Sequence, residues 1–336
     1  TSQPQRIETI AAAEVASLAL RGSGSCMDSI RGARAAQLAP KEHPDCARLN
    51  EWIVRLLLAQ LQTLGIFGSE LPYDAARMRA NSGVLEKFAR WWDESIDILQ
   101  QHGYAEMQQG CLRLTPRAMP PEQAWRDWRT HKEHFLAQAE TRTLAVLADD
   151  CLKQLPAVLR GTVPVTDILF PNGSMEKIEG LYKNNRVCDY FNDVVAAVAE
   201  RYIRQRCHSD PAAHIRIIEI GAGTGGTTST VLPHLHAWQD HIEEYCYTDL
   251  SRSFFNHARK RYGSTYPYLK YALCNIEQPL QSQDIAAGVY DIAIATNVLH
   301  ATRNMRVTLR NAKAALRSDG ILIMNEISGK TIFASV

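Results

Sequence analysis

The stretch Glu219–Gly226, which reads EIGAGTGG, decides the fold of this chain. It follows a short β-branched apolar segment, Ile215–Ile220, and it precedes a predicted helix that starts over Thr227–Leu232. A strand, a glycine-rich turn and a helix in this order form the opening unit of a nucleotide-binding α/β sheet. Glycines let the backbone approach a ligand closely, and the helix start offers unpaired backbone N–H groups. We therefore expect a ligand at this turn.

Two spacings fit the glycines of this turn. Gly221, Gly223 and Gly226 have the G-x-G-x-x-G spacing of dinucleotide-binding proteins. Gly221, Gly223 and Gly225 have the G-x-G-x-G spacing of enzymes that use S-adenosylmethionine (SAM). The motif by itself is weak evidence for either ligand, so the residues downstream have to decide.

Four further segments downstream of the glycine turn predict strands. They are Glu244–Asp249, Leu269–Asn275, Tyr290–Asn297 and Gly320–Glu326. We expect helices between them over Phe254–Tyr262 and Arg306–Arg317, with Ser251 and Thr302 as the respective N-caps. Strands that alternate with helices predict an α/β fold with a Rossmann-like, doubly wound parallel sheet.

The first half of the chain predicts mainly helices. Ile7–Leu20 is rich in helix formers, and Cys46–Leu64 and Val84–Gln101 each place apolar residues on one face. A length of 336 residues also suggests more than one core. We therefore expect a helical N-terminal lid or substrate subdomain over residues 1–164 and the Rossmann-like domain over residues 165–336.

A small hairpin is predicted over residues 104–114, followed by one long helix over Glu122–Leu159 with a break near Pro156. Helices followed by a hairpin also suggest a winged helix, so DNA binding has to be weighed. The helix before the hairpin carries four acidic residues, Glu86, Asp93, Glu94 and Asp97. These carboxylates would repel phosphates, so a helical cap over an active site is the better interpretation.

Composition excludes several classes of function. Hydrophobic content of 46% and charged content of 22% are those of a globular protein, and the net charge of +1 gives no electrostatic reason to bind nucleic acid or an acidic membrane. No apolar run approaches the roughly 20 residues of a spanning helix. The 8 cysteines form no C-x-x-C pair, which argues against a zinc site and a disulfide framework and favours reduced thiols in the cytoplasm.

Ligands of such sheets bind at the carboxyl ends of the strands, where this chain places polar side chains. Asp249 ends the second strand and is suited to two ribose hydroxyls, although it could instead stabilise the helix that starts at Ser251. Asn275 and Ile276 end the third strand and offer an amide edge and an apolar face to an adenine. Asn297 ends the fourth.

Glu219 separates the two ligands that the glycines allow. Its carboxylate lies two residues before the first glycine and could face a cation, such as the amino group of a methionine moiety. A pyrophosphate would be repelled by it. The sequence therefore favours SAM over a nicotinamide dinucleotide.

His300 and Glu326 follow two consecutive strands that are normally close in such a sheet. A lone histidine is more often structural than catalytic. A histidine beside a carboxylate at the mouth of a cofactor site is suited to act as a base with an orienting partner. Spacing alone leaves the structural and catalytic interpretations open.

The chain resembles the class I SAM-dependent methyltransferases, and more narrowly the C-methyltransferase domains of fungal non-reducing polyketide synthases. The segments that carry the general resemblance are Glu219–Thr228, Tyr247–Ser251, Asn297–Thr302 and Gly320–Glu326. The segments typical of the narrower group are Asp167–Glu176, Leu181–Asn185 and Asp189–Asn192. The specific resemblance covers about residues 165–335, and the helical half is similar only in general character.

This resemblance implies methylation of the α-carbon of a β-ketoacyl thioester held on an acyl carrier protein, beside neighbouring polyketide synthase domains. It implies SAM as the cofactor, S-adenosyl-L-homocysteine as its product, no metal, and a catalytic dyad of His300 and Glu326. Together with the strand ends it points to cofactor contacts at Glu219, Gly221, Gly223, Thr224, Gly225, Asp249, Leu250, Asn275, Ile276, Asn297 and Tyr190. Tyr182, Tyr190 and Phe191 are expected to help close the site, with core packing as the alternative for each.

The chain departs from the family at its end. Class I sheets usually have seven strands and finish in an antiparallel hairpin, whereas this sequence ends at Val336, so the hairpin is expected to be absent. Three other functions stay open at this point. They are a stand-alone O- or N-methyltransferase, a catalytically silent SAM-binding scaffold and a nicotinamide dehydrogenase.

Overall fold

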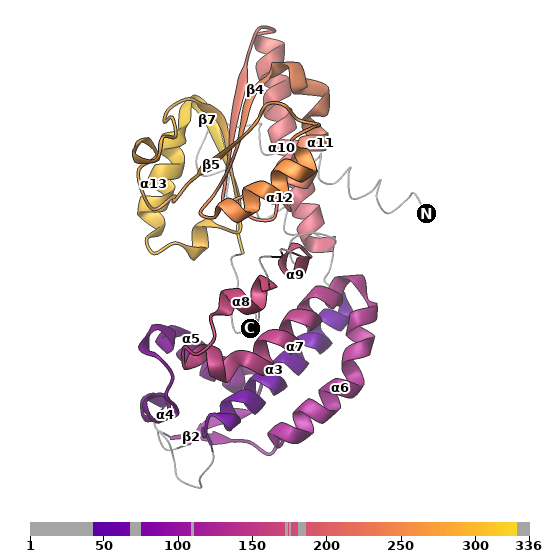
Figure 1. Cartoon of the computed structure of the whole chain (residues 1–336), viewed down its shortest axis with the longest axis vertical. Helices are drawn as coiled ribbons and strands as arrows, with labels where there is room; N and C mark the ends of the chain where they lie inside the picture. The colour runs from indigo at the N-terminus through magenta and orange to yellow at the C-terminus, as the bar shows by residue number, and fades with distance from the viewer. Residues whose placement is uncertain are drawn as a thin grey trace. The chain divides into compact units, whose positions relative to one another are not determined.

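The computed structural model describes residues 43–67, 75–108, 111–171, 174, 176–180 and 186–327. These residues form two compact units, a helical unit over 43–180 and a sheet unit over 186–327 (Figure 1). The helix predicted over Ile7–Leu20 lies outside the described residues. The division of roles between a lid and a methyltransferase domain, with its boundary near residue 165, stays a prediction.

The helical unit is built around α3 (Pro44–Thr63), which packs against α6 (Pro121–Ala137) and α7 (Ala139–Leu159). Figure 1 shows these three helices side by side. The apolar face predicted for this segment is the buried one, since Leu49, Ile53 and Leu57 are fully enclosed. The shorter helices of the unit are α4 (Ala75–Ser82), η1 (Glu86–Phe88), α5 (Ala89–Gln101), α8 (Val165–Leu169) and α9 (Glu176–Glu179).

The expected long helix is two helices, and the break lies at Gln138 instead of Pro156. Gln138 has an extended backbone with ψ of 131°, whereas Pro156 lies inside α7. Side chains after the break satisfy the carbonyl groups that α6 leaves open: Thr141 Oγ1 donates to Phe135 O at 2.8 Å. Pro156 lies in the last turn of α7, where it removes one backbone donor without ending the helix before Leu159.

The predicted hairpin is confirmed. It pairs β1 (Ala105–Gln108) with β2 (Cys111–Leu114) in antiparallel register, with Ala105 opposite Leu114. Tyr104 just before β1 is buried and donates through its hydroxyl to Glu51 of α3 at 2.6 Å. This contact fixes the hairpin to the helical core.

The sheet unit confirms the predicted α/β fold. Its strands are β3 (Ile215–Ile220), β4 (Ile242–Asp249), β5 (Leu269–Leu273), β6 (Tyr290–Thr296) and β7 (Leu316–Asn325). They lie in the order β5-β4-β3-β6-β7, and every neighbouring pair is parallel. The order reverses between β3 and β6, which makes the end of β3 the topological switch point.

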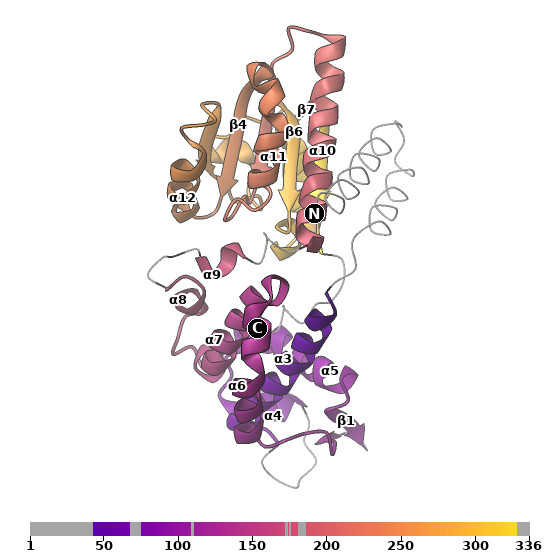
Figure 2. The same cartoon turned by 90° about the vertical axis from the view of Figure 1, so that its right-hand side faces the viewer.

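Helices cover both faces of this sheet. They are α10 (Arg186–Ser209), α11 (Thr228–Leu235), α12 (Arg252–Tyr262) and α13 (Met305–Ala315), with short turns η3 (His236–His241), η4 (Leu280–Gln283) and η5 (Leu299–Ala301). Residues of α10, α11 and α12 share one core with the sheet, and residues of α13 share the other. Figures 1 and 2 show this division, with α10 and α11 lying along the same face.

Two local predictions near the chain's last helix are wrong. Asn304 caps α13, because its side chain accepts from the backbone N–H groups of Arg306 and Val307, whereas the predicted cap Thr302 donates to Leu299 O. The helix also ends at Ala315, and β7 begins at once with an irregularity in its pairing to β6. The other predicted cap, Ser251, is confirmed because it accepts from Ser253 N.

Candidate active site

The carboxyl ends of five parallel strands lie at one edge of the sheet, which we call the carboxyl edge. β3 and β6 are neighbours, so the glycine turn after β3 lies beside η5 after β6. Every site residue predicted from a strand end is therefore brought to this edge. Tyr190 comes instead from α10, and Tyr182 lies outside the described residues.

The glycine turn has the backbone of the SAM spacing. Gly221, Gly223 and Gly225 have φ of 64°, 56° and 79°, and Gly226 is not among the glycines with positive φ. At Gly221 a side chain is excluded for a second reason, since a Cβ there would lie 2.2 Å from a methyl group of Val298. The cofactor turn and the loop that leads to His300 are thus in direct contact.

Two tyrosines that the sequence analysis missed hold this turn. Tyr247 of β4 donates through its hydroxyl to Gly223 O at 2.6 Å, and Tyr262 of α12 donates to Gly225 O at 3.3 Å. A signal for one of them was present: Tyr245 and Tyr247 alternate along the strand that leads to Asp249, so they share one face. The turn is therefore fixed before any ligand binds.

Glu219 is buried at the base of the turn, with only 2% of its surface exposed. Its Oε2 accepts hydrogen bonds from Thr228 Oγ1 and from the Tyr245 hydroxyl, both at 2.6 Å. Burial raises the pKa of Glu219 to about 7, although the two hydroxyl donors lower it in part. A cation beside this group would favour the charged form and pull the pKa down.

Asp249 joins the turn to the next helix. Its Oδ2 accepts from Gly223 N and its Oδ1 accepts from Ser251 N, each at 3.0 Å. Burial raises the pKa of this carboxyl, while the backbone N–H donors oppose the shift. Through Ser251, the N-cap of α12, Asp249 contacts the start of the next helix, which was the alternative role weighed for it. Each carboxylate oxygen still has lone pairs that could accept from a ligand hydroxyl.

Leu250, Asn275 and Ile276, which were predicted as cofactor contacts, differ in exposure. Leu250 is 71% exposed, whereas Ile276 is 5% exposed and packs into the core beside α13. Asn275 uses its side-chain oxygen within its own turn, where it accepts from Glu277 N at 3.0 Å, and Gln283 binds its backbone on both sides. Among the large apolar side chains that the structure describes, Leu250 is the most exposed.

Asn297 and Tyr190 also have partners within the protein. Asn297 has φ of 52°, donates through its backbone to Asn325 O at 2.8 Å and accepts from Ile327 N at 3.2 Å through its side chain. Tyr190 is buried and lies edge-to-face on Phe191, with ring centroids 5.2 Å apart. Asn297 therefore shapes the turn out of β6, and Tyr190 contributes to packing on α10.

His300 and Glu326 form a hydrogen-bonded pair through His300 Nδ1 and Glu326 Oε2. The other oxygen of Glu326 accepts from Leu299 N at 2.9 Å and from Val298 N at 3.2 Å. A carboxylate only accepts, so Nδ1 carries the proton and Nε2 is the basic nitrogen. With 44% of its side chain exposed, His300 is accessible to a substrate, while Glu326 holds both its ring and its loop.

Two hydroxyl groups at the carboxyl edge are orphaned. Among the residues that the structure describes, Thr224 Oγ1 and Thr296 Oγ1 are buried without a hydrogen-bond partner. Buried hydroxyls normally have partners, so a polar ligand at this edge would satisfy them. The raised pKa of Glu219 suits a nearby cation, and the free lone pairs of the Asp249 carboxylate suit ligand hydroxyls. The residues present therefore fit a ligand that carries a cation and several hydroxyls, as SAM does.

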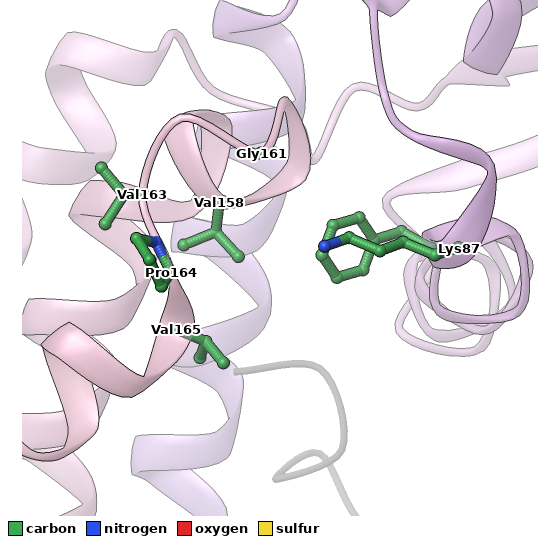
Figure 3. A pocket seen from close by; sticks show the side chains of 7 residues that line it. Lys87, Val158, Gly161, Val163, Pro164 and Val165 are labelled. Carbon is green, nitrogen blue, oxygen red and sulfur yellow. The ribbon is translucent and has the colours of Figure 1, made fainter.

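A cavity of about 320 Å³ is lined by residues of the helical unit alone. Figure 3 shows Lys87 reaching toward it from one side and Val158, Pro164 and Val165 lining the other. None of the predicted site residues lines it. Within the described ranges no group of three His, Cys, Asp or Glu side chains could hold a metal, and no helix is long and apolar enough to cross a membrane.

Known proteins match the chain in sequence and in fold. The family described as "Methyltransferase domain" matches residues 218–322. The polyketide synthase PksM of Bacillus subtilis is 44% identical over 86% of this chain. The chain spans only 5% to 13% of the length of the curated relatives that match most of it.

Solved structures of carbon methyltransferases match the fold of this chain. The DszA carbon methyltransferase superposes with a TM-score of 0.77 at 32% identity, over 87% of this chain and 74% of that one. The CMeT domain of the citrinin polyketide synthase has a TM-score of 0.71 over 99% of this chain and 82% of that one. At 22% identity this second match shows the fold alone, and four relatives that match 84% to 90% of the chain are bacterial.

Proposed function

Since the chain belongs to the SAM-dependent methyltransferase family, we propose that it is a carbon methyltransferase domain of a polyketide synthase, acting on the α-carbon of a β-ketoacyl thioester. The observation that carries this proposal is the pair of His300 and Glu326, whose loop lies against the cofactor turn at Gly221. A base and a methyl donor have to be close together for this reaction.

The glycine turn and its neighbours hold the cofactor in this proposal. Asp249 accepts from the ribose hydroxyls, Glu219 faces the amino group, and the buried Thr224 hydroxyl, which has no partner among the described residues, hydrogen-bonds to the cofactor. SAM, when bound, supplies an electrophilic methyl group. Leu250 covers the adenine, because its apolar side chain follows β4 directly and is exposed. The helical unit is assigned the role of a lid by resemblance to the family.

His300 is the general base. Its Nε2 takes the proton from the α-carbon, which two neighbouring carbonyl groups make acidic enough for a neutral imidazole. Glu326 keeps the proton on Nδ1 and stabilises the imidazolium that forms, so it acts as the orienting partner. The resulting carbon nucleophile is then directed at the methyl group by its position in the site.

The relatives support the proposed substrate class and partners. PksM and PksR are polyketide synthases, and in such assemblies the acyl chain is expected on an acyl carrier protein. The narrower assignment to fungal non-reducing synthases is not part of the proposal, because three relatives that match at least 84% of the chain at 40% to 45% identity are bacterial. The eight cysteines without metal or disulfide spacing suit a reducing cytoplasm.

The test is methyl transfer from labelled SAM to acetoacetyl-N-acetylcysteamine, a small β-ketoacyl thioester. We expect C-methylated product from the parent protein and a loss of turnover of about 10²- to 10⁴-fold in His300→Ala, the contribution of a general base. SAM affinity should not change, because His300 contacts none of the predicted cofactor residues.

His208→Ala is the matched control. His208 is an exposed histidine at the end of α10, which leads into the amino-terminal start of β3 at the opposite edge of the sheet. It should turn over like the parent. Full turnover in His300→Ala would remove the base, and product methylated on oxygen or nitrogen would replace the proposal with the O- or N-methyltransferase alternative.

A further inference from the structure

The surface of α13 and the loop just before it carry a row of cations that the proposed reaction does not use. Arg303, Arg306, Arg310 and Lys313 are all exposed, and we call them the basic stripe. In the part of the chain that the structure describes, none of the four side chains has a carboxylate partner. The nearest carboxylate contact is made by backbone, where Arg303 N donates to Glu277 Oε1 at 2.5 Å.

The basic stripe is continuous and begins beside the dyad. Arg306, Arg310 and Lys313 are spaced by four and three residues, so they share one face of α13. The opposite face is buried through Thr308, Ala312 and Ala315, and it covers the sheet. Since η5 with His300 immediately precedes α13, the stripe runs outward from the carboxyl edge along the helix visible at one side of Figure 1.

Stability does not account for these charges. Arg303 and Arg306 lie at the start of α13, where the positive end of the helix dipole disfavours cations, and the first turn has no acidic residue. Several other cations of the sheet unit have carboxylate partners: Arg204 pairs with Glu200 at 2.5 Å, Lys270 with Glu244 at 2.9 Å and Arg317 with Asp291 at 3.3 Å. The stripe is therefore a local excess of charge in a chain whose net charge is +1.

We propose that the basic stripe is the docking surface for an acidic protein domain that carries the thioester substrate to His300. This inference rests on the proposed function. Rows of unpaired cations attract and orient a negatively charged partner, although each exposed pair contributes little by itself. The chain spans at most 13% of its polyketide synthase relatives, so such a partner has room within the same polypeptide.

The test compares two forms of one substrate, an acetoacetyl group on an acidic acyl carrier protein and the same group on N-acetylcysteamine. In Arg306→Glu combined with Arg310→Glu, we expect KM for the carrier-bound substrate to rise about tenfold or more at low salt, with the effect shrinking as salt screens the charges. KM and kcat for the small thioester, SAM affinity and the melting temperature should match those of the parent.

Lys260→Glu is the control, because Lys260 is an exposed cation on α12, on the other face of the sheet. Its KM for the carrier-bound substrate should stay within twofold of the parent. An unchanged KM in the stripe variant, or an equal rise for both substrates or in Lys260→Glu, would overturn the docking surface. Failure of the parent to methylate the small thioester would instead reject the proposed function itself.

Discussion

The two halves of the carboxyl edge use a carboxylate in opposite ways. On the β3 side Glu219 is sealed at 2% exposure and is held by two hydroxyl groups, and burial raises its pKa to about 7. On the β6 side Glu326 is partly exposed and accepts from two backbone N–H groups and from His300. The protonation of Glu219 is therefore sensitive to a charge in a nearby ligand, whereas Glu326 keeps the imidazole of His300 oriented.

This difference teaches that position at a sheet edge does not determine what a carboxylate does. Glu219 is the second-last residue of β3 and Glu326 directly follows β7. Their behaviour nevertheless differs, because the two carboxylates differ in burial and in the type of hydrogen-bond donor. The two halves meet where Val298 lies against Gly221. Substitutions on either side of that contact should therefore have distinguishable consequences.

Gly221→Ala should break both halves at once. The new methyl group would collide with Val298, and the alanine would have to adopt a φ of 64°, which is strained for any residue with a side chain. We therefore expect the free energy of unfolding to fall by about 2 to 4 kcal/mol. SAM affinity and turnover should fall together. Gly288→Ala is the control, because Gly288 has φ of 72° but nothing within 4 Å. Equal destabilisation of the two variants, measured by chemical denaturation, would mean that the contact between the halves is unimportant.

Glu219 should make stability depend on pH. Folding raises its pKa from 4.5 to about 7, so between these values the folded protein keeps a proton that the unfolded chain has lost. The shifted carboxyl of Glu219 therefore adds to the free energy of unfolding below pH 4.5. This stabilisation declines as the pH rises toward 7, by on the order of 3 kcal/mol. Denaturation of Glu219→Gln across this window should lack the decline, and a slope equal to that of the parent would contradict the shifted pKa.

Glu326→Gln should affect only the catalytic half. The amide preserves the shape of the side chain but no longer stabilises an imidazolium, so we expect turnover to fall about 10²-fold with SAM affinity unchanged. Turnover with the small thioester and SAM titration by calorimetry would measure the two effects. A loss of SAM affinity of the same size would show that the halves are not separable.

Tyr247→Phe should produce the smallest effect, confined to the cofactor half. Removing the hydroxyl that binds Gly223 O at 2.6 Å costs about 1 kcal/mol, which we expect as a severalfold weaker SAM affinity. Tyr262→Phe should cost less, because its contact to Gly225 O is longer at 3.3 Å. The reverse ranking in calorimetry would indicate that these hydroxyls do not hold the turn.

Much of the fold was predictable because its signals are local. The five strands were placed within a few residues, and Ser251 was correctly assigned as a cap, since alternation and capping depend on neighbours in the chain. The errors came where distant contacts compete with local preference. Gln138 breaks the long helix because carbonyl groups of α6 find side-chain partners there, which a proline rule does not foresee.

The sequence by itself determined the glycine turn, the parallel sheet and the proximity of His300 to Glu326, because spacing and strand order dictate what gathers at one edge. Only the tertiary structure decided how these groups are held. Tyr247 on Gly223, Tyr245 on Glu219 and Val298 against Gly221 join segments far apart in the chain. Such contacts depend on how far each side chain is buried and which way it points in the folded protein. The periodicity of a single sequence does not contain that information.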